Sequence, residues 1–482
     1  MLAKLLRQLT GRAEPGSGSA IPKDLRADFE PVRASVHALL REGKVAEALA
    51  EIAPVLASES AFSTIRNLNE FALRGISSLT RQDAWRNEIT YHLGTILLSL
   101  EDAEGAALCA GIVWNEPDAV RAYRRFERGP DIVDYCRAEG LPVHEFPQLA
   151  VARMDERPAP RVGQPRSTMC MLRDALVIGE SFLPATSDSI VFSERCTDSP
   201  LKLERYNGIR QLDMLRMAVD SALWAAEAGT DCYAGPHVLV GSHENIGHWL
   251  LFYFSRLRLL EEMPALREAK VVVGETAKPL HLECLRRAGF AEDRVLRLRA
   301  GRYGAFDELW VPSMLSGISG GDVRYWHPEV LRYVRRILGA APPRGGGGRR
   351  IYLSRRGVRW RRLLNEDEVV AALAGLGFEE FDPGTLDLQQ QIDLAAEASA
   401  IVGIFGAGMN FHLFAGEGVP VFQLQLEERV RMDIHPALAA VLGQPFIPVV
   451  GESARNHPDP LKSDFSVSVG NLVEVVSRAL NC

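Results

Sequence analysis

The alternation of apolar and polar positions divides the chain into a helical first third and an α/β remainder. Within residues 25–112, apolar side chains such as Val36 and Leu40 recur at helical spacing, and Gly43 predicts a turn between two helices. From about residue 165, short apolar runs alternate with longer amphipathic segments. That alternation is typical of α/β proteins.

The middle of the chain predicts a mainly parallel sheet covered by helices. The expected strands are 174–179, 189–192, 238–240, 270–273 and 307–311. The expected helices are 213–228, 247–260, 279–288 and 327–338. The segment from Gly339 to Arg349 is rich in glycine and proline and predicts a linker.

A second α/β set is expected beyond the linker. Its predicted strands are 350–354, 378–381, 400–404 and 419–424, and its predicted helices are 365–376, 388–398 and 408–415. The whole pattern divides the chain into a flexible segment, a helical accessory domain and two α/β domains. These parts are 1–24, 25–160, 161–340 and 349–482.

Two predicted C-terminal strands end in residues suited to holding phosphate. Arg355 and Arg361 follow the first strand, and Gly406, Ala407 and Gly408 follow the second. Carboxyl ends of parallel strands meet at one edge of a sheet. A glycine turn before a helix exposes backbone N–H groups, and guanidinium groups neutralise phosphate. The pattern predicts a nucleoside diphosphate site. The alternatives are arginines paired with nearby carboxylates and a glycine turn without a ligand.

An ordered set of short motifs lies between residues 245 and 414, within a resemblance that covers roughly residues 165–450. Its members are Asn245–Trp249, Glu308–Ser313, His327-Pro328, Tyr352–Arg355, Arg361, Asn365-Glu366, Gln391-Ile392, Gly406-Ala407-Gly408 and Phe414. In this order the set resembles the family-61 glycosyltransferases, often labelled capsular polysaccharide biosynthesis proteins. The resemblance implies two Rossmann-like domains in the GT-B architecture and an inverting transfer from a nucleotide sugar, expected to be UDP-linked. The acceptor it implies is a glycan of a surface or capsular polysaccharide.

The donor-binding residues expected on this basis lie in the C-terminal half. They are Arg355, Arg361, Asn365, Gln391, Gly406, Ala407, Gly408 and His412. The amide of Gln391 could equally cap or pack its helix. Phe405 stands where the family usually has histidine, and Phe252 where it often has an acidic residue. His412 could replace the imidazole missing at Phe405.

The general base is expected from the N-terminal half, where acceptors bind in this architecture. His248 and Glu244 lie in a segment that follows a strand and opens a helix, and Glu275 follows another predicted strand. Imidazole titrates near neutrality, and a buried carboxylate can be tuned upward. The alternatives are a helix-capping role for Glu244 and a packed imidazole for His248. No D-x-D motif occurs, so we expect a reaction that needs neither metal nor cofactor.

Composition narrows the classes of partner. The formal net charge of −7 gives no reason to expect nucleic acid, and seven scattered cysteines without a C-x-x-C pair are typical of reduced thiols. No apolar run reaches the roughly 18–20 residues that span a bilayer, and no signal peptide is apparent, so we expect a cytoplasmic protein. The cationic Met1–Leu9 could contact an anionic membrane weakly or form a frayed helix.

Three further alternatives for the role of the chain and its domains fit the sequence. The helical accessory domain could dock a protein partner or pack on the catalytic core. The chain could be a sugar-nucleotide epimerase or hydrolase built on the same fold. It could also be a transferase-like scaffold in polysaccharide assembly that has lost catalysis.

Overall fold

The computed structural model describes most of the α/β region and part of the helical region. The described residues are 23–56, parts of 93–112, 122–147, 167–178, 182–192, 214–217, 221–226, 230–241, 243, 246–275, 277–299, 303–315, 317–319, 323–325, 327–340, 348–358, 360–427, 434–456 and 463–481. The expected cationic segment Met1–Leu9 and most of the linker lie outside them. No helix in the described part of the chain combines the length and the hydropathy needed to cross a bilayer.

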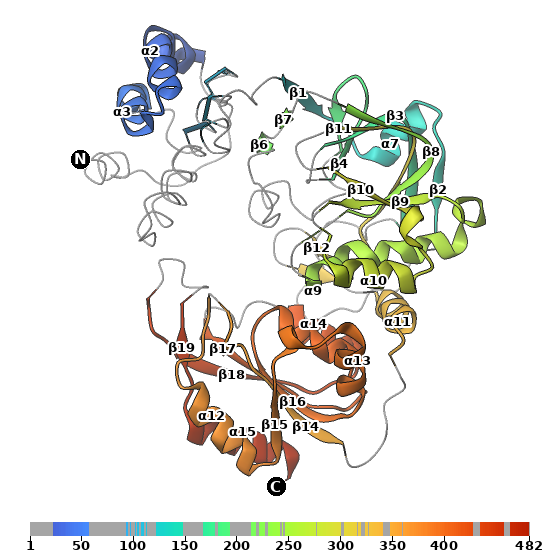
Figure 1. Ribbon diagram of the computed structural model, residues 1–482, viewed down its shortest axis with the longest axis vertical. Coiled ribbons are helices and arrows are strands. Elements are labelled where there is room, and N and C mark those ends of the chain that lie inside the picture. Colours follow the sequence, from blue (N-terminus) through green and yellow to red (C-terminus); the bar gives the residue numbers. More distant parts are fainter. Residues whose placement is uncertain are drawn as a thin grey trace.

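The described N-terminal elements are two helices that pack on each other. They are α2 (Lys23–Arg41) and α3 (Val45–Leu56), and the predicted turn at Gly43 separates them with a φ of 71°. A buried pair ties α2 to a later segment, because His37 Nε2 lies 2.7 Å from Asp102 Oδ2. Figure 1 shows this helical pair at the upper left, apart from the two sheets.

The first sheet has eleven strands among the described residues. They are β1 (Ala122–Arg128), β2 (Val143–Glu145), β3 (Thr168–Ile178), β4 (Leu183–Ala185), β5 (Ile190–Val191), β6 (Met214–Met217), β7 (Ser221–Ala226), β8 (Thr230–Leu239), β9 (Lys270–Gly274), β10 (Val295–Leu298) and β11 (Tyr303–Pro312). Their order is β10-β9-β8-β11-β3-β4-β5-β1-β7-β6, with β2 beside β3. We call this sheet and its helices the N-terminal α/β unit.

The expectation of a mainly parallel sheet holds for only one end of this unit. β10, β9, β8 and β11 are parallel to one another, whereas β11 pairs with β3 in antiparallel register and further antiparallel pairs follow. The sheet is therefore mixed. The structure also corrects the expected helical domain over residues 25–160. Its residues 122–128 and 143–145 form β1 and β2, which belong to this sheet.

The helix expected over residues 213–228 is wrong, because the structure has the strands β6 and β7 there. β7 pairs along its length with β1, six residues against six, and β6 pairs with β7. The segment is rich in alanine and leucine, which are strong helix formers, but intrinsic propensity is a small energy per residue. Pairing with a strand almost a hundred residues earlier overrides that local preference.

The helices expected over 279–288 and 327–338 are confirmed as α10 (Pro279–Arg287) and α11 (Pro328–Ile337). The other helices of the unit are α7 (Ile132–Ala138), α9 (Ile246–His248), η5 (Trp249–Tyr253), η6 (Phe254–Glu262), η7 (Pro264–Leu266) and η8 (Glu292–Arg294). The helix expected over 247–260 is irregular, because α9 passes through a π-helical turn, η5, into a 3-10 helix, η6. All five side chains of η5 are buried, so the run has no polar face. A small hairpin of β12 (Gly317–Ser319) and β13 (Val323–Tyr325) precedes α11.

The C-terminal α/β unit is a doubly wound sheet. Its elements are β14 (Arg349–Leu353), α12 (Glu366–Gly375), β15 (Phe378–Phe381), η9 (Pro383–Thr385), α13 (Leu388–Ala396), β16 (Ala398–Ile404), η10 (Ala407–Phe414), β17 (Val421–Leu426), α14 (Ile434–Val441), β18 (Phe446–Ser453), β19 (Phe465–Ser466) and α15 (Val469–Leu480). The strand order is β15-β14-β16-β17-β18-β19, parallel except for β19. The predicted elements up to residue 424 are confirmed within a few residues.

Both faces of this sheet are covered, which explains its continuous apolar strands. Ile351 and Leu353 belong to the apolar cluster that contains Ile392 of α13. Tyr352, between them, belongs to the cluster that contains Val369 of α12. Successive residues of a strand point to opposite faces, so α12 and α15 lie on one side and α13, η10 and α14 on the other (Figure 1).

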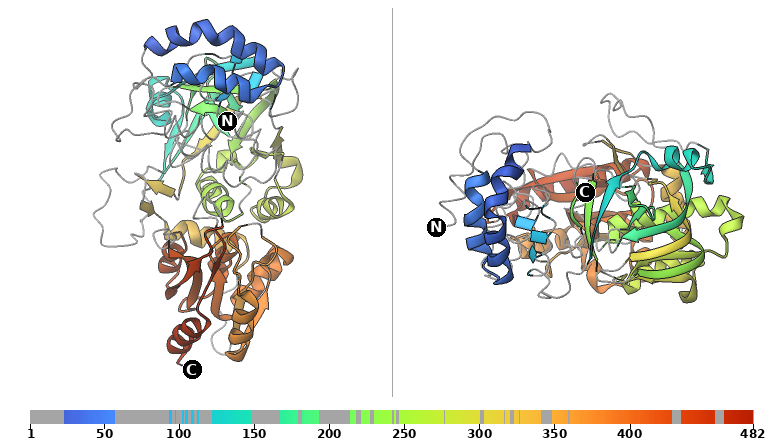
Figure 2. Two further views of the ribbon diagram at one scale, coloured as in Figure 1. Left: turned by 90° about the vertical axis from the view of Figure 1, so that its left-hand side faces the viewer. Right: turned by 90° about the horizontal axis from the view of Figure 1, so that it is seen from above.

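The two units meet along helices that follow their strands. One apolar cluster runs from Leu251 of η5 through Tyr333 of α11 to Phe411 of η10. Arg335 of α11 donates to the carbonyl oxygens of Leu413 and Ala415, the second at 2.8 Å. Figure 2 shows the C-terminal unit at one end of the elongated molecule. The junction is therefore both apolar and hydrogen-bonded.

Candidate functional site

The strand order of the C-terminal unit marks one place on its edge. Numbered along the chain, the five parallel strands stand in the order 2-1-3-4-5, so the chain turns in opposite directions after β14 and after β16. Ligands of open α/β sheets bind outside the carboxyl ends of the strands at such a switch point. Arg355 follows β14 and Gly406 follows β16, so both flank this position.

Arg355 and Gly406 are in direct contact. Arg355 Nη1 donates to the carbonyl oxygen of Phe405 at 2.7 Å. A Cβ atom at Gly406 would lie 1.7 Å from the same nitrogen, and the φ of Gly406 is 159°. Only glycine leaves room for this guanidinium, so the structure brings together two residues that the sequence analysis placed in one site.

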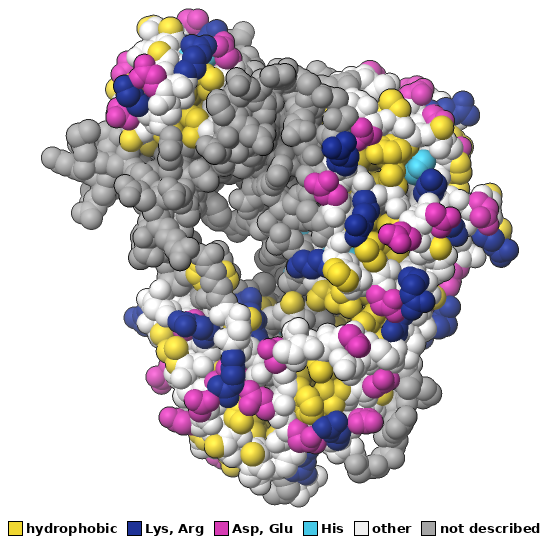
Figure 3. Space-filling model, viewed as in Figure 1, with side chains coloured by type: hydrophobic (Ala, Val, Ile, Leu, Met, Phe, Trp, Pro, Cys, Tyr) yellow, Lys and Arg dark blue, Asp and Glu magenta, His cyan; other side chains and the backbone are white. Residues whose placement is uncertain are grey.

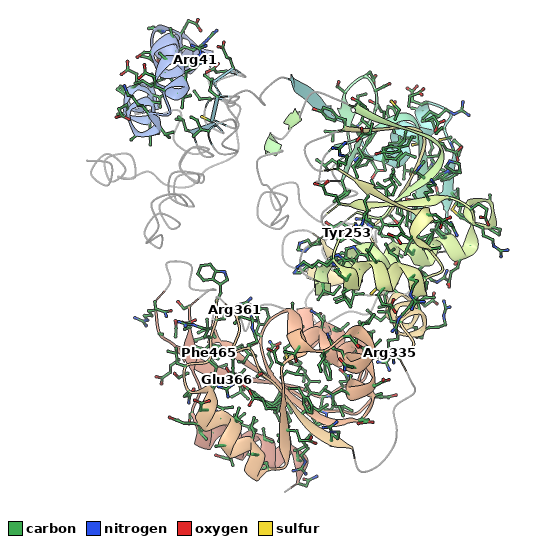
Figure 4. All side chains as sticks on the ribbon, viewed as in Figure 1. Arg41, Tyr253, Arg335, Arg361, Glu366 and Phe465 are labelled. Carbon is green, nitrogen blue, oxygen red and sulfur yellow. The ribbon has the colours of Figure 1, made fainter. Side chains whose placement is uncertain are left out.

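Arg361 contacts the same turn through the aromatic ring of Phe405. Its guanidinium carbon lies 5.3 Å from the centroid of the Phe405 ring, within the range of a cation–π contact. Its backbone has a φ of 58°, a left-handed conformation that non-glycine residues seldom adopt. Figure 4 shows Arg361 at the edge of the C-terminal unit that faces the N-terminal unit.

Neighbouring arginines are engaged in surface ion pairs. Arg356 donates to Glu380 at 2.8 Å and to Asp367 at 2.6 Å, and Arg362 donates to Asp464 at 2.7 Å. For these two, the alternative interpretation of the cluster as a salt-bridged surface is right. The position of Arg355 and Arg361 against Phe405 and Gly406 distinguishes them from the other arginines.

A buried carboxylate supports the loop that carries Arg355. Glu366, at the start of α12, is 7% exposed, and its Oε1 accepts from Tyr352 Oη at 2.8 Å and from the Arg355 backbone N–H at 3.2 Å. Burial, reinforced by this carboxylate, raises the pKa of Tyr352, so the phenol stays protonated and donates. Glu366 lies deeper in the unit than Arg361 (Figure 4). The sequence analysis did not anticipate this supporting role.

Two expected donor-binding amides have partners within the protein. Asn365 donates through Nδ2 to the Val467 carbonyl at 2.8 Å and accepts from the Val467 N–H at 3.2 Å. Gln391 donates to the carbonyls of Pro383 and Leu386 at 3.1 and 3.0 Å. Asn365 thus joins α12 to the segment before α15, and Gln391 fixes the turn at η9. That turn lies beside the glycine motif, because a Cβ at Gly408 would be 3.6 Å from Pro383.

His412 lies in the core behind the turn. It is fully buried, its Nδ1 lies 2.7 Å from Gln444 Oε1, and its ring meets His435 edge-on at 5.9 Å. Burial lowers the pKa of His412 to about 4, against a smaller opposing effect of the Gln444 hydrogen bond. Its imidazole is therefore neutral at pH 7 and shielded from a ligand at the edge. His435 in turn packs against the Phe405 ring at 5.2 Å.

The N-terminal unit has a switch point of its own. Its parallel strands β8, β9, β10 and β11 stand in the order 3-2-1-4, so the change of direction lies between β8 and β11. Arg256, 1% exposed, joins the carboxyl ends of these two strands. It donates to the Val240 carbonyl at 3.3 Å and contacts the sulfur of Met314. This buried cation fixes the end of the sheet from which the predicted base residues extend.

Two histidines stack at this second switch point. His243 follows β8 and His248 ends α9, and their rings lie 4.9 Å apart at an angle of 17°. His248 is half-buried, and its ring also packs against Phe252 at 5.4 Å. Glu244 lies outside the described residues. Glu275, just past β9, is exposed on the same edge, where its N–H donates to Leu298 at 2.9 Å.

A third imidazole lies beneath this pair. His281, at the start of α10, packs against Trp249 at 4.6 Å and accepts from the Lys278 N–H through Nδ1 at 3.0 Å. Burial first, then Lys278 and His243, lowers the pKa of His281 to about 4. His281 is neutral at pH 7 and is part of the support for the stacked pair.

The two edges meet through one close contact. A Cβ at Gly247 would lie 1.9 Å from Asn410 Nδ2. Gly247 directly precedes His248, and Asn410 lies in η10, two residues past Gly408. The contact brings the α9 segment, which carries the predicted base, to the helix that starts at the predicted diphosphate site. The sequence offered no signal for it, because 163 residues separate the two positions.

One comparison with known proteins covers most of this region. Residues 246–422 match the family model described as Glycosyltransferase 61. The matched segment begins at the first residue of α9 and ends within β17, so it contains the residues on both edges from Gly247 to Asn410. No curated protein matches the chain.

Proposed function

We propose that this chain, whose residues 246–422 match the glycosyltransferase 61 model, transfers a sugar from a nucleoside diphosphate donor to a glycan hydroxyl with inversion. The donor is a UDP-sugar in this proposal, and the product is part of a surface polysaccharide. The family match supports glycosyl transfer itself. The finer terms rest on the resemblance of the motifs and on the site geometry.

The proposal rests on the contact between Arg355 and the glycine turn. The guanidinium of Arg355 lies against Gly406 at the switch point of a doubly wound sheet, with Arg361 beside it. A leaving nucleoside diphosphate needs cationic groups and free N–H groups where its charge develops, and this position offers both. On the face shown in Figure 3, acidic and basic side chains intermingle over the described surface. A small local anion therefore suits the site better than a polyanion.

His248 is the base in this mechanism. The acceptor hydroxyl oxygen forms a bond to the anomeric carbon while the bond from that carbon to the diphosphate oxygen breaks. The hydroxyl proton goes to the imidazole, and the leaving electron pair stays on the diphosphate beside Arg355 and Arg361. An imidazole suits this role because it accepts a proton near neutral pH. Glu275, on the same edge, and Glu244 remain the alternatives.

No metal enters this proposal, because the arginines and the start of η10 supply the positive potential at the diphosphate. The first test is release of nucleoside diphosphate from a panel of nucleotide sugars with a glycan acceptor mixture, in buffer containing EDTA. We expect turnover with one donor class. We also expect Arg355→Ala to abolish it and Arg356→Ala, which breaks surface ion pairs in the same loop, to retain it.

The base has a separate test with the same assay. His248→Ala should reduce turnover by about a hundredfold or more while leaving nucleoside diphosphate affinity unchanged. Turnover that requires added divalent cation would contradict metal independence. Release of an isomerised nucleotide sugar without transfer would favour the epimerase alternative, and the absence of nucleotide binding would favour the scaffold.

A further inference from the structure

Phe405 is the residue on which both site arginines converge. Its carbonyl oxygen accepts from Arg355 Nη1, and its ring carries the guanidinium of Arg361. We infer that Phe405 is a positioning residue that holds Arg361 in place for the diphosphate of the donor. This inference rests on the proposed function, because it assumes that the anion at this edge is a nucleoside diphosphate.

The ring of Phe405 is buried between neighbours that fix it. It is 8% exposed, with Arg361 at 5.3 Å and the imidazole of His435 edge-on at 5.2 Å. His435 is itself fixed, because its Nδ1 lies 2.6 Å from Gln423 Oε1 in the buried face of β17. A ring packed in this way offers a rigid surface to the guanidinium.

The backbone conformation of Arg361 indicates that surrounding contacts fix this residue. A φ of 58° costs a non-glycine residue free energy, and such conformations persist only where surrounding contacts fix them. The contact with Phe405 is one such constraint on the side chain. A residue kept in an unfavourable conformation beside a predicted anion site is consistent with preorganisation for a ligand.

Preorganisation has a direct consequence for affinity. An arginine free to sample its rotamers loses that freedom when it binds phosphate, which weakens the interaction. Stacking on a ring restricts the guanidinium beforehand, so less freedom is lost when it contacts phosphate. Arg355 is restricted differently, through the Phe405 carbonyl, and that contact does not depend on the ring.

The two contacts can be tested separately, because Arg361 contacts the ring of Phe405 and Arg355 contacts its carbonyl. Phe405→Leu removes the aromatic surface and keeps the carbonyl that binds Arg355. Phe405→Tyr keeps the aromatic surface. Phe414→Leu removes another buried phenylalanine of the C-terminal unit, at the end of η10, and serves as the control for a loss of packing without a site arginine.

The experiment is a calorimetric titration with UDP, and with GDP, ADP, CDP and dTDP if UDP does not bind. It uses the full chain as wild type, the three phenylalanine variants, Arg361→Ala, and the double variant Phe405→Leu/Arg361→Ala. We expect Phe405→Leu to weaken binding about fivefold and Arg361→Ala about tenfold. Phe405→Tyr and Phe414→Leu should bind as the wild type does. The double variant should bind no more weakly than Arg361→Ala alone, because the ring acts through that arginine.

Two results would overturn the inference while leaving the proposed function intact. One is unchanged affinity in Phe405→Leu, and the other is a double variant in which the two losses multiply. A wild-type chain that binds none of the five nucleoside diphosphates would instead overturn the proposed function. Melting temperatures of all variants, measured without ligand, separate loss of folding from loss of binding.

Discussion

Gly406 illustrates how a single missing side chain permits the site. A Cβ atom there would overlap Arg355 Nη1 at 1.7 Å, so alanine must displace the guanidinium or the turn. We expect Gly406→Ala to weaken nucleoside diphosphate binding at least tenfold and to lower the unfolding free energy by about 1–3 kcal/mol. Denaturant unfolding and a UDP titration measure these effects.

Gly357→Ala is the matched control, since Gly357 lies in the same loop and a Cβ there meets no atom within 4 Å. It should leave both quantities close to those of the wild type. Equal behaviour of the two alanine variants would contradict the close approach of Arg355.

Two buried histidines predict how stability depends on pH. Burial lowers the pKa of both His412 and His281 to about 4, whereas in the unfolded chain an imidazole titrates near 6.5. Between these values the unfolded chain binds more protons, so acid favours unfolding. The unfolding free energy should therefore fall as the pH drops from about 6.5 towards 4.

The measurement is denaturant unfolding at pH 7.5 and pH 5.0. His412→Asn should be less stable than the wild type at pH 7.5, because it leaves a cavity, but its loss of stability on acidification should be smaller. A wild-type free energy that is the same at both pH values would show that these imidazoles are not buried in neutral form.

At the residue scale, the sequence predicted contacts that follow from position along a strand. Arg355 and Gly406 each come directly after an apolar strand, and that was enough to place them at one edge. The true partners of Asn365 and Gln391 could not be predicted in this way. They are backbone groups at Val467, Pro383 and Leu386, and local pattern carries no information about which carbonyl or N–H a side chain will meet.

At the scale of elements, local periodicity succeeded where a strand or helix is stabilised by its own sequence. The strands of the C-terminal sheet are short apolar runs between amphipathic helices, and they were predicted within a few residues. The helix prediction for residues 213–228 was wrong because β7 is stabilised by its pairing with β1. The π-helical form of η5 was missed for another reason, since a run of five buried side chains has no polar–apolar periodicity.

The contact between α9 and η10 yields a prediction about packing between the two units. Gly247→Ala places a methyl group 1.9 Å from Asn410 Nδ2 and 2.6 Å from its Cγ, so we expect a loss of about 1–3 kcal/mol in unfolding free energy. Asn410→Ala in the same chain removes the atoms that the methyl group would meet. The double variant should therefore be more stable than Gly247→Ala alone.

Thermal unfolding of the two single variants and the double variant measures this coupling. A double variant whose destabilisation equals the sum of the single effects would show that Gly247 and Asn410 do not touch. Because Gly247 precedes the predicted base and Asn410 follows the glycine turn, the coupling also tests whether the two edges are fixed to each other.

At the scale of the whole molecule, the sequence predicted an α/β protein with a site at a strand edge, and the structure bears out that class. It could not predict strand order. The orders 2-1-3-4-5 and 3-2-1-4 depend on which side of a strand the chain returns to, which apolar runs do not encode. Those orders nevertheless define the two switch points. The mixed half of the first sheet was missed because β3 and β11 pair across more than a hundred residues.

The proposed function divides the roles between the two units. In this proposal the C-terminal edge holds the diphosphate through Arg355, and the N-terminal edge contributes the base. The most direct test is the thermal shift of the wild type, Arg355→Ala and Arg356→Ala with nucleoside diphosphates in EDTA. A ligand at a hundred times its dissociation constant stabilises the folded chain by about 2.7 kcal/mol. We predict a shift in the wild type and in Arg356→Ala and none in Arg355→Ala. No shift in the wild type, or equal shifts in all three, would contradict the account.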